Sequence, residues 1–185
     1  MPPGETAFLT FRLHGTIPTA TAHELKAAPT QAQQAGTDHH RARKQLFAAL
    51  DVVLDRALIG PCYFDDEKVA EVLAGEIMML AETGFTIHGF GILPNHAHFM
   101  LRLPARSGLS FAKALKLLHV RTGKHCRRLV RPKLPPEAAF WQPGWLKIPL
   151  LDATELVRAQ AYVRGNARQA GLPARFQAWP YVNEE

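Results

Sequence analysis

The sequence predicts an α+β protein in which strands and amphipathic helices share one domain. Residues 6–13 alternate between two faces, and residues 85–103 form two strand-like runs joined at Pro94-Asn95, which predicts a β-hairpin. Capping residues precede stretches with apolar side chains at helical spacing, which predicts the helices. The 185 residues can bury a substantial core, and neither an internal repeat nor a domain boundary is visible. We therefore expect residues 1–185 to form a single domain.

The first half of the chain is expected to hold two helices after its opening strand. Residues 16–37 are rich in Ala, Thr, Gln and Pro, and they predict a loose excursion. Asp38 can cap a helix that runs to about Leu58. Asp65 can cap a second helix, which ends at Gly84.

The second half is expected to hold two further helices and a short strand. A helix starts at about Leu109, directly after the hairpin, and a proline-rich loop ends it. Residues 140–150 contain a short strand. Asp152 caps the last helix, with Glu155 three residues later completing a capping box, and Gly171 closes it.

Basic residues gather between Glu82 and Glu137, where 54 consecutive residues contain no Asp or Glu. Ten Lys and Arg lie in this stretch, which exceeds the net charge of +6 for the whole chain. This pattern predicts a polyanionic partner, most commonly the phosphate backbone of nucleic acid. The alternative is a solvated helix face whose acidic partners lie elsewhere in the chain. The residues expected to contact DNA are Arg102, Arg106, Lys113, Lys116, Arg121, Lys124, Arg127 and Arg128.

Two histidines two residues apart form the most informative motif. His96 and His98 lie in the second strand of the hairpin, so both imidazoles point to the same face. The opposite face carries Ala97, Phe99 and Leu101, which suit a core. We therefore expect the pair on the face away from the core, where two imidazoles can bind one divalent ion. The same spacing also occurs in half-exposed strands that bind no metal, so the motif alone leaves both interpretations open.

The last helix carries a second pair of chemical groups, Tyr162 and Asn166. They are four residues apart and so share one side of the helix. Asn166 and the neighbouring Gly165 are both poor helix formers, which favours a functional reason for their presence, although a fraying helix end would also explain them. A phenol is a poor nucleophile unless its oxyanion is stabilised, and a divalent ion can help by withdrawing charge from a phosphate under attack.

Six motifs, in order, resemble those of the REP-associated tyrosine transposases, a branch of the HUH single-strand endonucleases. They are TFRL at 10–13, GPCY at 60–63, LPNHAHFM at 93–100, FWQ at 140–142, YVRGNARQAGL at 162–172 and WPY at 179–181. Each motif alone is modest support, whereas the ordered set spans about residues 7–181.

The resemblance implies a ferredoxin-like HUH endonuclease fold, with helices packed on an antiparallel sheet. It implies that His96 and His98 bind the metal, that Asn166 completes the metal site, and that Tyr162 forms a 5′-phosphotyrosine intermediate. The implied activity is that of a transposase that nicks and rejoins single-stranded DNA near hairpins, with Mg²⁺ or Mn²⁺ as cofactor. The implied partner is single-stranded or hairpin DNA, and a homodimer is left open because the family includes dimers and monomers.

Three positions depart from the family pattern. Ala167 replaces the proline after the helix asparagine, His119 replaces a lysine, and residues 146–148 replace a pair of the Asp-His type. Two other functions therefore stay open. One is a catalytically silent, domesticated protein that binds nucleic-acid hairpins. The other is a metal-dependent hydrolase of small phosphoesters, against which the acid-free segment argues.

The cysteines and the hydropathy of the chain indicate the cellular compartment to expect. Cys62 and Cys126 are far apart in the sequence, and they predict free thiols in a reducing compartment, the cytoplasm. The N-terminal residues show no charged segment followed by an apolar run, so we expect no secretory signal. No apolar stretch approaches the ~20 residues of a membrane span, so no membrane partner is expected.

Overall fold

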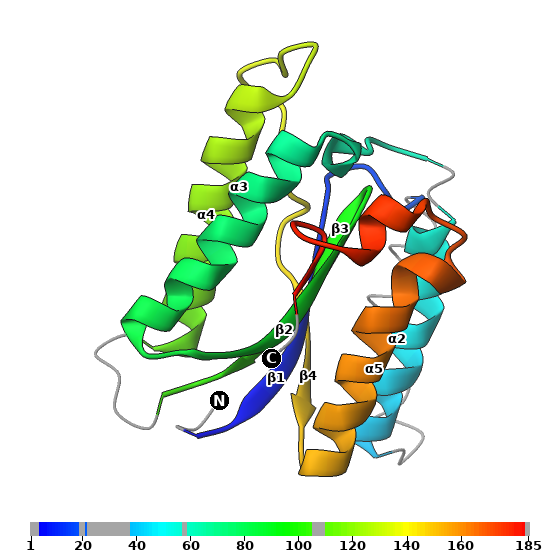
Figure 1. Ribbon diagram of the computed structural model, residues 1–185, viewed down its shortest axis with the longest axis vertical. Coiled ribbons are helices and arrows are strands. Elements are labelled where there is room, and N and C mark those ends of the chain that lie inside the picture. The colour runs from blue at the N-terminus through cyan, green and yellow to red at the C-terminus, as the bar shows by residue number, and fades with distance from the viewer. Residues whose placement is uncertain (1–3, 19–20, 22–37, 57–58, 105–109, 184–185) are drawn as a thin grey trace.

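The computed structural model describes residues 4–18, 21, 38–56, 59–104 and 110–183 (Figure 1). Most of the excursion predicted at 16–37, and Arg106, lie outside the described residues. Short 3-10 helices lie at Tyr63–Asp65, Met79–Thr83 and Ala174–Gln177. The strands and longer helices are β1 (Thr6–Arg12), α2 (His39–Asp55), α3 (Glu67–Met78), β2 (Thr86–Leu93), β3 (His96–Arg102), α4 (Phe111–Leu129), β4 (Leu146–Leu150), α5 (Ala153–Gln169) and β5 (Val182–Asn183).

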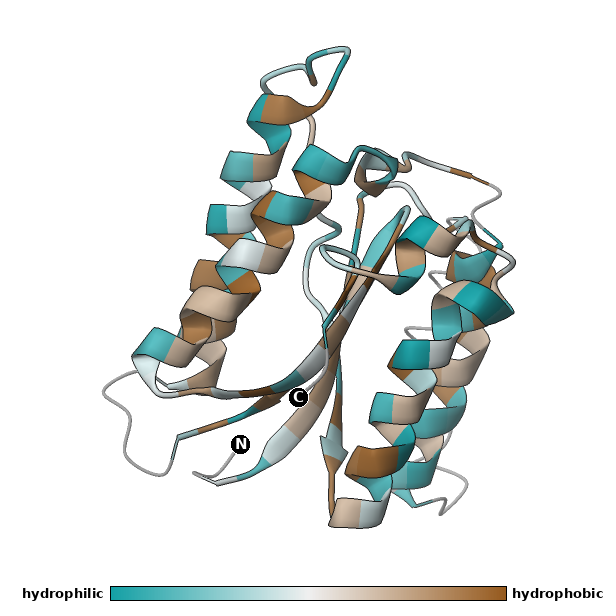
Figure 2. Ribbon diagram, viewed as in Figure 1, coloured by the Kyte–Doolittle hydropathy of each residue, from teal (hydrophilic) through white to brown (hydrophobic). Residues whose placement is uncertain are grey.

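The strands form one antiparallel sheet in the order β4-β1-β3-β2-β5. Helices α3 and α4 cover one face of this sheet, and α2 and α5 cover the other (Figure 1). Each helix carries both hydrophilic and hydrophobic residues, as expected when one side packs on a sheet and the other meets solvent (Figure 2). The predicted α+β class, with helices packed on an antiparallel sheet, is confirmed.

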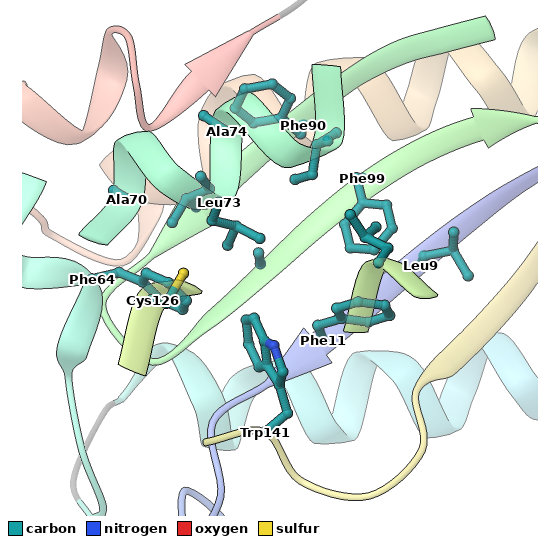
Figure 3. Close-up of a cluster of buried hydrophobic side chains, with 14 of the residues drawn as sticks. Leu9, Phe11, Phe64, Ala70, Leu73, Ala74, Phe90, Phe99, Cys126 and Trp141 are labelled. Atoms are coloured by element: carbon teal, nitrogen blue, oxygen red, sulfur yellow. The ribbon is translucent and has the colours of Figure 1, made fainter. Parts of the chain in front are cut away.

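The larger core lies between the sheet and helices α3 and α4. Leu9, Phe11 and Phe99 project from the central strands towards Leu73 of α3 and Cys126 of α4 (Figure 3). All five side chains are buried. This is the core face that the alternation of β3 predicts.

The opposite face of the sheet holds a second, smaller core under α2 and α5. Phe8, Met100, Ile148 and Val163 are buried there, and Tyr162 packs against them. The expectation that this face lies away from the core is therefore wrong. Two helices cover it because both of their inner sides carry apolar residues, so the strand buries side chains on both faces.

Aspartate and serine side chains cap the helices. Asp38 accepts a hydrogen bond from the amide of His40, which confirms its predicted role. The cap of α3 is Asp66, which accepts from Lys68, and the prediction of Asp65 is wrong by one position because Asp65 belongs to the preceding 3-10 helix. Ser110 caps α4.

Two expectations from composition concern the thiols and the membrane. Cys62 and Cys126 are both free, as expected. Among the helices of the described residues, none has the length and apolar character needed to cross a membrane.

Gly91 of β2 lets α5 approach the sheet closely. A Cβ atom at this position would lie 3.0 Å from Cγ1 of Val163 and 3.5 Å from its carbonyl oxygen. Gly91 pairs with His98 on the neighbouring strand. Tyr162 precedes Val163 in α5, so the close approach of α5 at Gly91 also brings Tyr162 towards the histidines. We expect Gly91→Ala to lower the free energy of unfolding by about 1–3 kcal/mol, because the added methyl group overpacks the contact. Denaturant titration measures this change.

Gly75→Ala is the matched control for that substitution. Gly75 lies within α3, and an added Cβ would meet no heavy atom within 4 Å. The same chemical change should there stabilise the protein by up to about 1 kcal/mol, because alanine favours the helix. Equal effects at both glycines would refute the close approach at Gly91.

Candidate metal centre and tyrosine

His96 and His98 lie side by side on β3, as their spacing predicts, and both have an exposed fraction of 0%. Their Nε2 atoms are 3.1 Å apart. The pair was expected on a face away from the core, but it is fully buried under α2 and α5, which also excludes the alternative of a half-exposed sheet surface. A buried imidazole is costly unless its ring nitrogens have polar partners, so the surroundings of the pair matter.

The neighbouring turn residue, Asn95, fixes the protonation of His96. The Asn95 side-chain amide donates to the carbonyl of Leu54 at 2.9 Å, which leaves its Oδ1 as an acceptor. Nδ1 of His96 lies 2.6 Å from that oxygen and so carries the proton. Burial, and then the nearby His98, lower the pKa of His96 well below its usual value, so the ring is neutral. Its Nε2 therefore presents a lone pair to the cluster.

His98 is held in the same way from the adjacent strand. Its Nδ1 is hydrogen-bonded at 3.0 Å to Oγ1 of Thr10, the residue that pairs with it on β1. Each ring thus has its outer nitrogen occupied, and the two inner nitrogens face each other. Such second contacts orient histidines that bind metal ions.

Helix α2 contributes two carboxylates that sequence reasoning missed. Oδ1 of Asp51 lies 3.0 Å from Nε2 of His98 and 3.8 Å from Nε2 of His96. Oδ1 of Asp55, one helical turn later, lies 3.8 Å from Nε2 of His96. The signal in the sequence was the placement of Asp51 and Asp55 beside Leu50 and Leu54, on the apolar side of a predicted helix.

The two carboxylates also influence each other. Burial and the nearby charge of Asp51 raise the pKa of Asp55 to about 7, and His98 acts in the opposite direction. A bound cation would favour the charged form of both groups. Asp51 is buried, whereas the Asp55 side chain has an exposed fraction of 24%.

The donor set fits a divalent ion. One ligand atom from each of Asp51, His96 and His98 can be chosen so that all lie within 4.8 Å of one another. Among the described residues, Oδ1 of Asp55 is buried without a hydrogen bond, and so is Oδ1 of Asp51 apart from its 3.0 Å ion-pair contact with Nε2 of His98. Such atoms are normally satisfied, and a cation bound between the imidazoles and a carboxylate would satisfy them.

Tyr162 of α5 lies next to this cluster. Its ring centroid is 5.8 Å from that of His98, and Phe8 and Phe47 contact both rings. The Tyr162 hydroxyl accepts a hydrogen bond of 2.7 Å from Nδ2 of Asn166. The structure therefore brings the predicted nucleophile beside the predicted metal pair.

Asn166 is buried, with an exposed fraction of 1%. Its amide nitrogen is bonded to Tyr162, and its Oδ1 is a buried atom without a hydrogen bond among the described residues. The role of Asn166 as a metal ligand stays a prediction. Its observed contact is with the tyrosine, one helical turn earlier, as their spacing predicts.

A cluster of ion pairs connects α2 to the N-terminal end of α5. The carboxylate of Glu155 accepts from Nε2 of His40 at 3.0 Å, from Lys44, and from the amide of Leu151 at 2.9 Å. Asp152 caps the helix by accepting from the Glu155 amide. The predicted capping box is thus only half formed, because the Glu155 side chain bonds to Leu151 and α2.

The hydrogen bonds to Glu155 make a testable contribution to stability. Burial acts to raise its pKa, but the hydrogen bonds from Leu151, Lys44 and His40 outweigh burial and lower it to about 2. The carboxylate therefore stabilises the folded chain above its ordinary pKa of 4.5, and this contribution is lost as the pH falls towards 2. We expect Glu155→Gln to cost about 1 kcal/mol at pH 7.

Denaturation of the Glu155→Gln variant and the wild type at several pH values measures this effect. The difference between them should shrink as the pH falls. Glu71→Gln, on the exposed side of α3, is the control and should change stability little at any pH. A Glu155→Gln difference that grows on acidification would contradict the assignment.

The predicted DNA-contacting residues lie mostly on α4, which is on the other face of the sheet from Tyr162 (Figure 1). Arg121 pairs with Glu76 at 3.1 Å, Arg127 donates to backbone carbonyls of the following loop, and Arg102 donates to the carbonyl of Gly4 at 3.2 Å. Exposed residues form a stripe on the outer side of α4, namely Lys113, Lys116, Lys124 and Arg128.

A second set of cations lies in the layer that carries the tyrosine, and sequence reasoning missed it. These residues occur outside the acid-free segment and were therefore not singled out. Exposed arginines and a lysine project from the two helices of that layer, namely Arg41, Arg43, Lys44, Arg158, Arg164 and Arg168.

Comparison with solved structures finds a likeness in fold. No family model matches the chain, and no curated protein matches it. A solved structure described as a REP-associated tyrosine transposase bound to a REP hairpin is similar, with a TM-score of 0.50 and 15% sequence identity. The likeness covers 97% of this chain and 76% of that one. At this identity the likeness shows a shared fold, which agrees with the fold that the sequence motifs imply.

Proposed function

We propose that this protein is a metal-dependent single-strand DNA endonuclease of the transposase type, which nicks and rejoins DNA near hairpins. The observation that carries the proposal is the convergence of His96, His98, Asp51 and Tyr162 in one cluster under α2 and α5. The fold shared with a hairpin-bound tyrosine transposase supports it. A small-phosphoester hydrolase would have no need of a tyrosine beside the metal ligands.

Tyr162 is the proposed nucleophile. Its phenolic oxygen attacks the phosphorus of a phosphodiester, and the bond from phosphorus to the 3′ oxygen breaks. The tyrosine loses its proton, the departing 3′ oxygen gains one, and the 5′ phosphate stays joined to Tyr162 as an ester. Attack by a 3′ hydroxyl reverses these steps and rejoins the strand. Asn166 donates to the phenolic oxygen and so stabilises negative charge on it as the proton leaves.

His96, His98 and Asp51 would hold the divalent cation. When bound, the cation withdraws charge from the phosphate under attack. Two imidazole nitrogens and one carboxylate suit Mn²⁺ and similar ions, and they would leave positions for the phosphate oxygens of a substrate. Asn95 and Thr10 keep the imidazoles in the required orientation through their hydrogen bonds.

DNA contacts divide between the two layers in this proposal. The exposed cations of α2 and α5 lie on the side of the tyrosine and suit the phosphates next to the scissile bond. The stripe on α4 lies on the opposite face, so it suits phosphates farther along the nucleic acid, as in a hairpin stem.

A covalent-adduct assay tests the proposed function. Labelled single strands that carry candidate hairpins are incubated with the protein and Mn²⁺, and the products are separated under denaturing conditions. We expect a labelled species that has the mass of protein plus DNA. Salt-sensitive hairpin binding without an adduct at any metal concentration would refute catalysis and leave the hairpin-binding alternative.

A separate prediction concerns hairpin binding by the stripe on α4. Lys116→Ala and Lys124→Ala should each weaken hairpin binding similarly for all sequences, because phosphate contacts do not read bases. Each should also reduce the slope of log affinity against log salt by about 1. Binding titrations at several salt concentrations measure both quantities. An unchanged slope in both variants would show that α4 does not contact the nucleic acid.

A further inference from the structure

A small apolar cavity lies beside the tyrosine, between α2, α5 and the edge of the sheet. Its volume is about 180 Å³, and its walls include Phe8, Phe47, Ile148, Leu150, Ala159 and Tyr162. The nucleophile of the proposed reaction is therefore one wall of the cavity. A site of this kind is smaller than the ~300 Å³ or more of pockets for drug-sized ligands, so it suits one ring system.

Three aromatic rings shape the interior of this cavity. The centroids of Phe8 and Phe47 are 5.0 Å apart, and the Phe47 and Tyr162 centroids are 5.7 Å apart. Both pairs are arranged edge to face. Ile148, on the floor, is buried. Flat aromatic ligands gain from contact with such rings, and every nucleobase has an apolar face that can stack or pack in this way.

Three charged side chains also line the cavity, at the side that we call its rim. Lys44 of α2, and Glu155 and Arg158 of α5, border the cavity. The Glu155 carboxylate already accepts hydrogen bonds from Lys44, His40 and the Leu151 amide. Its charge is thus compensated within the protein, and the exposed Arg158 gives the rim a net attraction for anions. A ligand that matches this layout has a flat apolar face and a negative group outside the cavity.

We propose that the cavity binds one unpaired nucleobase of the DNA strand, next to the phosphate that Tyr162 attacks. This inference rests on the proposed function and adds a specificity site to it. The base enters between Phe47 and Ala159, its polar edge faces the rim, and its phosphate lies against Arg158. Capture of this base would position the strand so that the neighbouring phosphate reaches the tyrosine.

Abasic substitution tests the proposal on the wild-type protein. Hairpin-bearing strands are prepared with one abasic site, placed in turn at each unpaired nucleotide, and their affinities are measured by fluorescence anisotropy. We expect one position to lose affinity by about tenfold, as for the loss of one stacked base. Equal affinities for all abasic strands would overturn the proposal.

A substitution that fills the cavity is the second test of the proposal. Ala159→Leu should bind the intact strand about as weakly as the wild type binds the critical abasic strand, and it should show no further loss with that strand. Ala161→Leu makes the same change at an exposed position of α5 and should behave as the wild type. An Ala159→Leu protein that keeps the full abasic penalty would overturn the proposal.

Photochemical crosslinking needs no variant and covers the case in which Ala159→Leu does not fold. Strands with 5-iodouracil at the critical position should crosslink to Phe8, Phe47 or Tyr162. Crosslinks only to α4 would overturn the proposal that the base binds in the cavity. They would leave the result of the adduct assay unaffected. If no hairpin strand binds at any salt concentration, the proposed function fails together with this inference. An adduct with no abasic effect removes the inference alone.

Discussion

Tyr162→Phe should abolish the covalent protein–DNA species. The substitution removes only the phenolic hydroxyl group, and the proposed reaction has no step without its oxygen. The ring of the variant can keep its contacts with Phe8, Phe47 and His98. The main structural cost is the lost hydrogen bond from Asn166, about 1 kcal/mol. Denaturing gels with labelled hairpin strands and Mn²⁺ measure the adduct.

The control for this prediction is hairpin binding by the same variant. Affinity should stay close to that of the wild type, because the hydroxyl serves the chemistry more than the binding. Persistence of an adduct in Tyr162→Phe would show that another side chain is the nucleophile, and peptide mapping of the adduct would then identify it.

The second large effect is expected at the metal ligands. His98→Ala should weaken Mn²⁺ binding by at least about 100-fold, since even residues behind the ligands commonly contribute 10–100-fold. Asp51→Asn keeps the shape of its side chain and should also weaken binding strongly, because it removes the only charge among the three proposed ligands. Calorimetric titration of each folded variant with Mn²⁺ measures the affinity.

His14→Ala is the matched control for the histidine variant. His14 is exposed just beyond β1. Its substitution removes one imidazole that is not part of the cluster. Its Mn²⁺ affinity should equal that of the wild type. If His98→Ala and Asp51→Asn both bind Mn²⁺ as tightly as His14→Ala, the cation does not occupy this cluster.

The strand and the tyrosine helix could be predicted from sequence because both depend on local periodicity. The period of two places His96 and His98 together whatever surrounds the strand. The helical period places Tyr162 one turn before Asn166, and the observed hydrogen bond follows from that spacing. Asp38 and Asp152 cap their helices for equally local reasons.

The packing of α2 could not be predicted in the same way. Asp51 is 45 or more positions from the histidines in the sequence, and only tertiary packing brings its carboxylate to them. The side of the sheet on which α4 packs is likewise a long-range outcome. Its basic residues follow the histidine strand directly in the sequence, yet the helix covers the face that carries Phe99.

In the proposed site, His96 and His98 hold a divalent cation beside Tyr162. Pulsed electron paramagnetic resonance of bound Mn²⁺ tests it most directly, because nitrogen nuclei bound to the ion modulate the signal. We predict coupling to two imidazole nitrogens in the wild type and to one fewer in His98→Ala. A wild-type Mn²⁺ signal without any nitrogen coupling would contradict the account.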